Sequence, residues 1–368
     1  MEEELKYLLA LTMIPSVGPL TAKKLIVYTG SASAVFREKK HILRKIPGIG
    51  STLAARAVSG DLLHKAEREI QFCRKNKISI LDYYSDQYPA RLKNCTDAPL
   101  ILFYKGKYCF NSMKMISMVG TRRASSYGID RCENFIKEIS EVYQDCIIVS
   151  GLAYGIDYQS HLAALKNNLN TIAVLGHGLH TIYPSQHRNV ALKIIENGCL
   201  CSDFASDMNP ERNNFIKRNR IIAGLTDATI VVESGIKGGA LITADIAGSY
   251  NRDVFAFPGR VKDEKSMGCN AMIKFNKAGL IEGLKDLEYF LGWERGEDGP
   301  PPRQKILFTE LSDDEEILVA ALKDEDKISL DSLSIKLDWP VSRVSSVLLN
   351  LEFEGIIRNY PGNCYKLV

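Results

Sequence analysis

The sequence lacks the features that mark several common classes of protein. Its 368 residues contain no apolar run of the roughly 18 residues that a membrane-spanning helix requires. The nine cysteines are an odd number and form no Cys-x-x-Cys pair, which argues against a zinc site and a disulfide framework. The acidic start, Met1 to Glu4, is unlike a signal peptide. We therefore expect a cytoplasmic protein with no membrane span, metal or cofactor.

Neither sign of charge dominates the whole chain, but its two parts differ. The net charge is +3, with 45% apolar and 25% charged residues, as in an ordinary soluble protein. Residues 305–368 carry 7 Lys and Arg against 12 Asp and Glu, so residues 1–304 carry 40 against 32. An anionic partner therefore belongs to the larger part.

Short β-branched apolar runs alternate with turns and helical stretches in the middle of the chain. This pattern predicts an α/β fold with a Rossmann-like, doubly wound parallel sheet. In such a sheet ligands bind beyond the carboxyl ends of the strands. Small, polar or backbone-exposing residues end several of the predicted strands and mark this edge: Ser150 and Gly151, Gly176 and Gly178, and Gly238 and Gly239.

Composition divides the chain into four segments. Residues 1–70 look helical, and their Ile14–Ala22 segment is echoed at Ile46–Ala54. This repeat resembles the SAM-like helix-hairpin-helix motif, in which Lys23, Lys24 and Arg56 are available to DNA; a plain packing module is the alternative. The core domain spans residues 71–293, and the proline-rich residues 294–304 form a linker.

Residues 305–368 are predicted to form a winged helix. Helices at 313–322, 330–337 and 341–354 precede a hairpin that turns at Pro361-Gly362-Asn363. The third helix offers only Arg343 against Glu352 and Glu354, which is a poor composition for reading duplex DNA. A docking or self-assembly role is therefore at least as well supported for this domain as duplex binding.

Several basic or glycine-rich segments are candidate anion contacts. Gly120, Thr121 and Arg122 directly follow a predicted strand, where glycine allows close approach and the next helix directs its N–H groups to the same place. Arginine adds a forked donor suited to phosphate. No dinucleotide fingerprint is present at this loop, so a nicotinamide cofactor is not expected. The further candidates are Arg188, Lys217, Arg218, Asn219 and Arg220, together with the Gly238-Gly239 loop.

The polar residues that could act in catalysis have structural alternatives. His161 lies four residues after Asp157, so the two side chains could hydrogen-bond on one helical face. Glu233 ends a strand and is the most plausible acid or base, but no second carboxylate is placed beside it. We expect both residues to be structural. Tyr154, Tyr183 and Phe215 lie near the candidate loops and could stack on bases or belong to the core.

Long runs in this sequence resemble the DNA-processing protein A family (DprA, also called Smf). The resemblance covers roughly residues 80–290 and extends through both flanking domains. It rests on the runs Val119–Arg122, Val149–Asp157, Ile172–Leu179, Tyr183-Pro184, Arg218–Leu225, Leu241–Ala244 and Phe257–Gly259. The sequence departs from the family pattern at Thr121, His180, Asp203 and Gly238, which leaves the basic residues in place.

The resemblance implies a non-enzymatic protein that binds single-stranded DNA. It further implies a homodimer that protects incoming strands and loads the RecA recombinase in natural transformation, with Arg122, Arg218 and Arg220 at positions linked to DNA. The alternative is an enzyme, a nucleotide phosphoribohydrolase of related fold. The segment Ile236–Asp245 lacks the proline and catalytic glutamate of that enzyme class, which disfavours the alternative.

Overall fold

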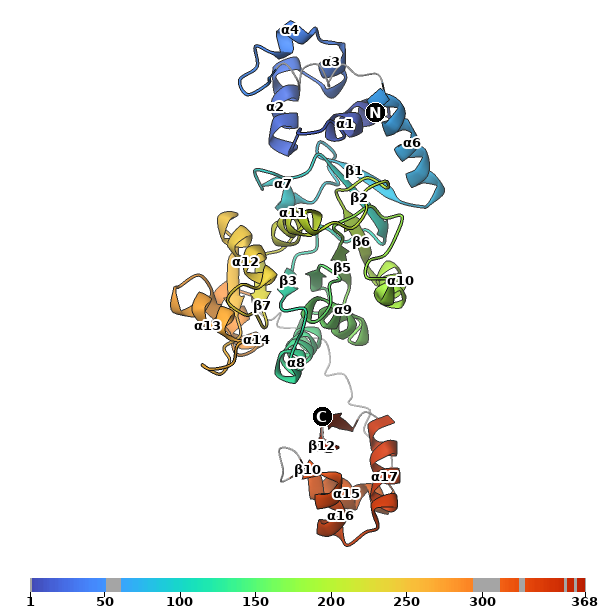
Figure 1. The fold of residues 1–368 in the computed structure, drawn as a ribbon, viewed down its shortest axis with the longest axis vertical. Coiled ribbons are helices and arrows are strands. Elements are labelled where there is room, and N and C mark those ends of the chain that lie inside the picture. Colours follow the sequence, from blue (N-terminus) through green and yellow to red (C-terminus); the bar gives the residue numbers. More distant parts are fainter. Residues whose placement is uncertain are drawn as a thin grey trace. The chain divides into compact units, whose positions relative to one another are not determined.

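The computed structural model describes residues 2–50, 61–293, 312–323, 328–353, 356–360 and 363–367. The chain forms two compact units, Met1–Pro300 and Pro301–Val368 (Figure 1). The predicted linker at 294–304 lies outside the described residues. No helix in the described ranges is long and apolar enough to cross a membrane.

A nine-stranded sheet forms the centre of the first unit, in the order β1-β2-β6-β5-β4-β3-β7-β8-β9. The seven strands from β6 to β9 are parallel, whereas β1 and β2 are antiparallel additions beyond β6. The predicted parallel sheet is confirmed. The strands are β1 (Ser79–Asp82), β2 (Ile101–Gly106), β3 (Met115–Val119), β4 (Ile147–Ser150), β5 (Thr171–Val174), β6 (Cys199–Ser202), β7 (Ala228–Val231), β8 (Asp253–Ala256) and β9 (Gly279–Leu280).

Helices cover both faces of this sheet (Figure 1). Alternate residues of each central strand point to opposite faces, so Met115 and Val119 join one buried cluster while Ile116 and Met118 join another. The first face is covered by α11 (Arg212–Gly224), α12 (Gly239–Ser249) and α13 (Met267–Lys274). The second is covered by α8 (Ser126–Val142), α9 (Ile156–Lys166), α10 (Arg188–Asn197) and α14 (Leu284–Leu291).

The topology places a switch point between β3 and β7. After β3 the chain moves outward through β4, β5 and β6, and it then returns to pair β7 with the other side of β3. The loops that leave β3 and β7 therefore run in opposite directions and open a crevice at their carboxyl ends. We call the ends of β3, β4, β5 and β7 the carboxyl edge.

The N-terminal helices are joined to the sheet by a shared apolar core. They are α1 (Glu2–Thr12), α2 (Pro19–Thr29), α3 (Ala32–Arg37), α4 (Lys40–Leu43) and α6 (Asp61–Lys75). Leu9 and Leu25 lie in the same buried cluster as Ile101 and Phe103 of β2. The second copy of the sequence repeat continues into residues 51–60, so Arg56 lies outside the described residues.

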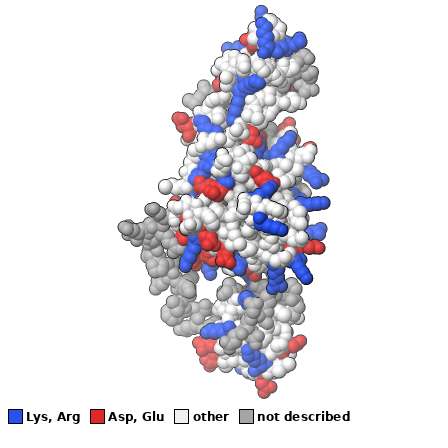
Figure 2. All heavy atoms as spheres, turned by 90° about the vertical axis from the view of Figure 1, so that its left-hand side faces the viewer, with Lys and Arg blue, Asp and Glu red and all other residues white. Residues whose placement is uncertain are grey.

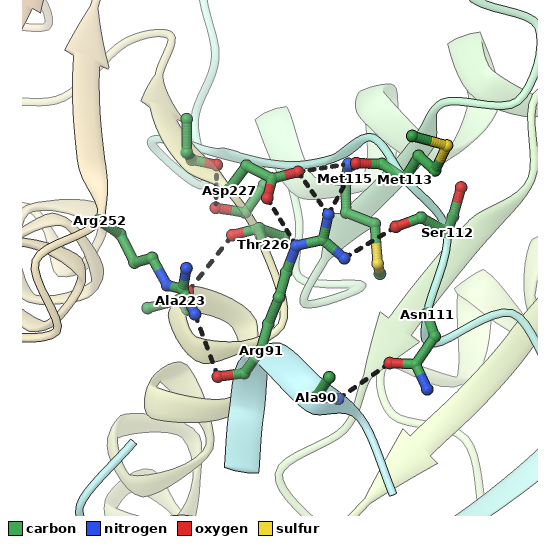
Figure 3. A network of polar contacts seen from close by, with 12 residues as sticks. Ala90, Arg91, Asn111, Ser112, Met113, Met115, Ala223, Thr226, Asp227 and Arg252 are labelled. Carbon is green, nitrogen blue, oxygen red and sulfur yellow. Dashed lines mark hydrogen bonds and ion pairs between the residues drawn. The ribbon is translucent and has the colours of Figure 1, made fainter. Parts of the chain in front are cut away.

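A bidentate ion pair fastens the edge hairpin to the central strands. Between β1 and β2, the short helix α7 (Ala90–Lys93) carries Arg91, whose Nε and Nη2 donate to the two carboxylate oxygens of Asp227 at 2.6 and 3.0 Å (Figure 3). Asp227 precedes β7 and also accepts from the backbone N–H of Met115, at 2.9 Å. The pair therefore fixes the amino ends of β3 and β7, opposite the carboxyl edge.

The second unit contains three helices and a three-stranded sheet. Its elements are α15 (Asp313–Lys323), β10 (Ile328–Ser329), α16 (Leu330–Leu337), α17 (Val341–Phe353), β11 (Ile357–Tyr360) and β12 (Cys364–Leu367). The strand order is β10-β12-β11, with antiparallel pairing throughout. Leu318, Leu333, Val344 and Leu351 form its buried core. The predicted winged helix is confirmed, although the Pro361-Gly362 turn lies outside the described residues.

Candidate nucleic-acid interface

The loops after β3, β4 and β7 meet at the carboxyl edge. The backbone N–H of Thr121 donates to the carbonyl of Glu233 at 2.7 Å, and the N–H of Ile156 donates to the carbonyl of Thr121 at 3.2 Å. A Cβ on Gly120 would collide with the Ile156 side chain, and Gly155 has a φ of +76° against the Thr121 carbonyl. Glycine is thus required at both positions for the three loops to approach one another.

Glu233 fills the anion position that the sequence predicts at the start of α8. Its carboxylate accepts from the backbone N–H of Ser125 at 2.8 Å and from the hydroxyl of Ser125 at 2.5 Å, and Ser125 is the N-cap of α8. Glu233 is buried, and its carboxylate lies where a Cβ on Gly128 would be placed. An internal carboxylate therefore complements the helix dipole at the point expected to receive a phosphate. This is a structural role for Glu233.

Arg218 lies beneath the loop that follows β4. Only 4% of the residue is exposed, and its guanidinium occupies the space that a Cβ on Gly151 would need. One terminal nitrogen donates to the carbonyl of Val174 at the end of β5, while Nε has no hydrogen-bond partner. Burial lowers the pKa of Arg218 from 12.5 to about 10, which still leaves it charged at neutral pH.

Asp157 supplies the counter-charge to this buried arginine. Burial raises the pKa of its carboxyl group, and the nearby charge of Arg218 is the largest influence in the opposite direction. The backbone N–H groups of Ala153 and Gly151 also lower the pKa of this carboxyl group, against the effect of burial. Asp157 and Arg218 are thus two buried, oppositely charged groups beside the loop after β4, and each favours the ionised form of the other.

The exposed cations at this edge include Arg122, Lys217 and Arg188, with Arg123 beside the first. Arg122 follows β3, Lys217 lies on α11, and Arg188 begins α10. Their side chains face solvent, so they are available to a polyanion without rearrangement. The prediction did not include Arg123, although its position next to Arg122 in the same exposed loop is visible in the sequence.

The other residues predicted to contact DNA, apart from the glycines, are partly or fully buried, and some of them bind partners within the protein. Arg220 pairs with Asp203 and also donates to the carbonyl of Asp97. Asn219 is half-buried on α11, and the hydroxyl of buried Ser150 donates to the carbonyl of Met118 at 2.7 Å.

The predicted glycines lie close to the backbone or side chains of other loops, with one exception. A Cβ on Gly176 would meet Phe215, a Cβ on Gly178 would meet the carbonyl of Ala205, and a Cβ on Gly238 would meet the Ser234 hydroxyl. Gly239, which begins α12, is exposed and has open space beside it. Of these loops, the start of α12 is therefore the one open to a ligand.

Exposed aromatic rings accompany the cations. Tyr154 is 43% exposed and donates from its hydroxyl to Gln186 at 3.0 Å, whereas Tyr183 is 49% exposed. The Tyr183 and Phe215 rings are 5.7 Å apart between centroids, with their planes 36° apart. Half-exposed rings beside fixed loops offer flat surfaces on which bases can stack.

His161 does not hydrogen-bond to Asp157, the partner that the helical spacing predicts. Its Nδ1 lies 2.7 Å from the Thr171 hydroxyl, rather than on Asp157. Burial lowers the pKa of His161 from 6.5 to about 3, and its Nε2 has no partner. The residue is a neutral core histidine. Across the described ranges, no group of three His, Cys, Asp or Glu residues could hold a metal ion.

The sequence interpretation missed a buried clasp between α6 and the loop after β6. Both carboxylate oxygens of Glu69 accept from Ser206, one from its N–H at 2.9 Å and the other from its hydroxyl at 2.5 Å. Ser206 lies against Gly178, so the clasp supports the carboxyl edge from outside the sheet. The sequence could have indicated that Glu69 is buried, because this residue lies on the same helical face as apolar Leu62, Ala66, Ile70 and Cys73.

The fold and site together define a class: a Rossmann-like α/β protein with a winged-helix tail, whose carboxyl edge displays cations and aromatic rings. The family model for DNA recombination-mediator protein A matches residues 79–292, and the model for the DprA winged helix domain matches residues 300–363. The chain belongs to the DNA recombination-mediator protein A family, whose members carry the names DprA and Smf.

Relatives and solved structures agree with this assignment. Protein Smf from Synechocystis sp. is 30% identical over 99% of this chain and 98% of its own length, and Protein Smf from Escherichia coli is 34% identical over 84% and 86%. The X-ray structure of DNA processing protein A from Streptococcus pneumoniae has a TM-score of 0.67 at 30% identity, covering 77% of this chain and 97% of its own. A structure of the Helicobacter pylori protein, described for its single-stranded DNA binding mode, has a TM-score of 0.53 at 25% identity, covering 58% and 95%.

Proposed function

We propose that this protein binds single-stranded DNA along the carboxyl edge and acts in DNA processing without catalysing a reaction. The observation that carries the proposal is the combination of exposed Arg122, Lys217 and Arg188 with half-exposed Tyr154 and Tyr183 at one edge. Fixed cations attract the phosphodiester backbone, and aromatic rings stack on bases of any sequence. The single-stranded DNA binding of the Helicobacter pylori relative supports this ligand class.

The proposed site separates direct contacts from supporting residues. Arg122, Lys217, Arg188 and the start of α12 at Gly239 face solvent or open space and would contact the strand. Arg218 is buried, and Arg220 is held by Asp203, so in this conformation both would act on the loops and on the local potential. The other glycines and Ser150 would allow the loops to approach one another.

We further propose that the protein works in the cytoplasm as a homodimer that delivers DNA to the RecA recombinase. Family membership supports this role. Exposed apolar side chains near the β9 edge also favour self-association, because Phe275, Tyr289 and Phe290 are 67%, 83% and 50% exposed. The proposed domains are residues 1–70, 71–293 and 305–368, with a linker at 294–304.

A nucleotide phosphoribohydrolase activity has less support. Such an enzyme needs a free carboxylate at the edge, yet Glu233 is committed to Ser125, and Asp245 pairs with Lys277 at 3.1 Å. Incubation with adenosine monophosphate tests this alternative, since release of free adenine would establish hydrolysis and displace the binding role as the primary function.

Fluorescence anisotropy of a labelled oligo-dT across a salt series tests the proposed function. We expect tight, salt-dependent binding that resists a duplex competitor and is strongly weakened by Arg122→Glu. Lys166→Glu is the matched control, because it makes the same change in net charge at the exposed end of α9. Failure of the parent protein to bind would refute the proposal, and equal weakening in both variants would show only a general charge effect.

A further inference from the structure

A dense group of cations lies at the end of the N-terminal helices. Residues 37–45 carry five Lys or Arg residues and one acid. Lys39, Lys40, Arg44 and Lys45 are all exposed around α4, and we call these four residues the α4 patch. Figure 2 shows lysine and arginine side chains gathered at the top of the molecule, where the N-terminal helices lie, with few acidic side chains among them.

Glu38, the acid next to the patch in the sequence, and Glu3 and Glu4 of α1 already have partners of their own. Glu4 accepts from the backbone N–H groups of Ala32 and Ser33 at 2.7 and 3.2 Å, at the start of α3. Glu3 lies 3.9 Å from Arg37, and Glu38 accepts from the backbone N–H of Lys39 at 2.8 Å. In the part of the chain that the structure describes, no ion pair is made by any member of the α4 patch.

The backbone beneath the patch is held in place. Leu43, Ile46 and Ile49 are buried, and they alternate with the exposed cations. Lys24 donates to the carbonyl of Pro47, which fixes the turn at Gly48, where φ is +87°. Lys24 is thus committed to the turn, and the α4 patch provides the cations that face solvent. Because the backbone that carries these cations is held in place, binding a polyanion there requires less ordering of the chain.

We propose that the α4 patch is a second contact for the phosphodiester backbone of single-stranded DNA that is already held at the carboxyl edge. This inference rests on the proposed function. In Figure 1, α4 lies at the end of the N-terminal helices that is remote from the sheet, so only a longer strand reaches both places. Lysine and arginine side chains bind phosphates irrespective of sequence, which suits a protein that must accept any incoming strand.

The test compares two lengths of labelled oligo-dT, about 12 and about 40 nucleotides, against the full-length protein. The test variant replaces Lys39, Lys40, Arg44 and Lys45 with Gln. The matched control replaces four other exposed lysines with Gln, on α8, α9, α10 and α14: Lys137, Lys166, Lys193 and Lys285. Circular dichroism and the urea midpoint establish that all three proteins are equally folded.

We expect the α4 variant to bind the short oligonucleotide as the parent does and the long one at least about tenfold more weakly. The salt slope for the long strand should fall by about 2 to 3, since each phosphate that a cation neutralises on a single strand contributes about 0.7 to the slope. Unchanged affinity and slope for the long strand, an equal weakening in the control variant, or an effect confined to duplex DNA would overturn the α4 contact. If the parent fails to bind even the short strand, the proposed function itself is wrong, and the α4 contact falls with it.

Discussion

Arg218 and Asp157 allow a direct test of the distinction between supporting and contacting residues. Replacing Arg218 with Met keeps an unbranched apolar stem but removes the guanidinium, its charge and its hydrogen bond to Val174. Asp157, itself 7% exposed, then loses the strongest influence that favours its ionised form. Asp157→Asn makes the reciprocal change, leaving the buried guanidinium without its counter-charge.

The expected magnitudes follow from burial. Removing one partner of a buried ion pair in direct contact costs about 3–5 kcal/mol. Arg218 and Asp157 influence each other without such a contact, so we expect a smaller loss from either single change. If the two residues compensate each other, the double variant should be less destabilised than the sum of the single variants by about 1–3 kcal/mol. Urea unfolding of the four proteins measures this coupling, and strict additivity would show that the pair is not a unit.

DNA binding supplies the second measurement for the same variants. Because Arg218 lies beneath Gly151, Arg218→Met should leave the salt slope for a short oligo-dT unchanged, whereas Arg122→Gln should lower it by about 0.7. A lower slope in Arg218→Met with undiminished stability would refute the reasoning, since it would make Arg218 a phosphate contact rather than a support.

Three further predictions concern stability. Asp227→Ala should lower the free energy of unfolding by about 3–5 kcal/mol, because it leaves the half-buried guanidinium of Arg91 without its carboxylate partner. An unchanged urea midpoint would contradict this prediction. Ser206→Ala should cost about 1–3 kcal/mol by depriving buried Glu69 of a donor, as thermal unfolding can show. His161 has a folded pKa of about 3 against 6.5, so the unfolded state binds the extra proton and stability falls as pH drops below 6.5. At about pH 5 the loss of stability from His161 is about 2 kcal/mol. If a His161→Asn variant loses stability with pH in the same way as the parent, His161 is not the source of the effect.

The parallel sheet could be predicted because its strands are buried on both faces. Such strands consist mainly of apolar and β-branched residues, and runs such as Ile147–Val149 and Thr229–Val232 have this composition. The place of β1 and β2 in the sheet order, beyond β6, could not be predicted in the same way. Their antiparallel pairing depends on β6 and on the long-range ion pair of Arg91 with Asp227, neither of which is recorded in local sequence.

The charged segment on α11 illustrates what helical spacing does and does not reveal. Phe215 lies three residues before Arg218, and Ile221 and Ile222 lie three and four residues after it, so this spacing indicates that Arg218 faces inward. In the structure Arg218 is indeed buried. The pairing of Arg220 with Asp203 was not readable, because Asp203 lies in a loop whose path depends on β6.

Formal charge therefore overstates the charge that this protein can offer to DNA. Residues 1–304 carry an excess of eight cations, yet Arg91, Arg218 and Arg220 are committed to internal partners, and Lys24 holds a turn. Those cations tie together the elements that shape the carboxyl edge, whereas the exposed cations at that edge and in the α4 patch remain available to DNA. Affinity for DNA should accordingly depend on few cations at each place and on strand length, so that a short oligonucleotide measures the edge alone and the increment with length measures the second contact.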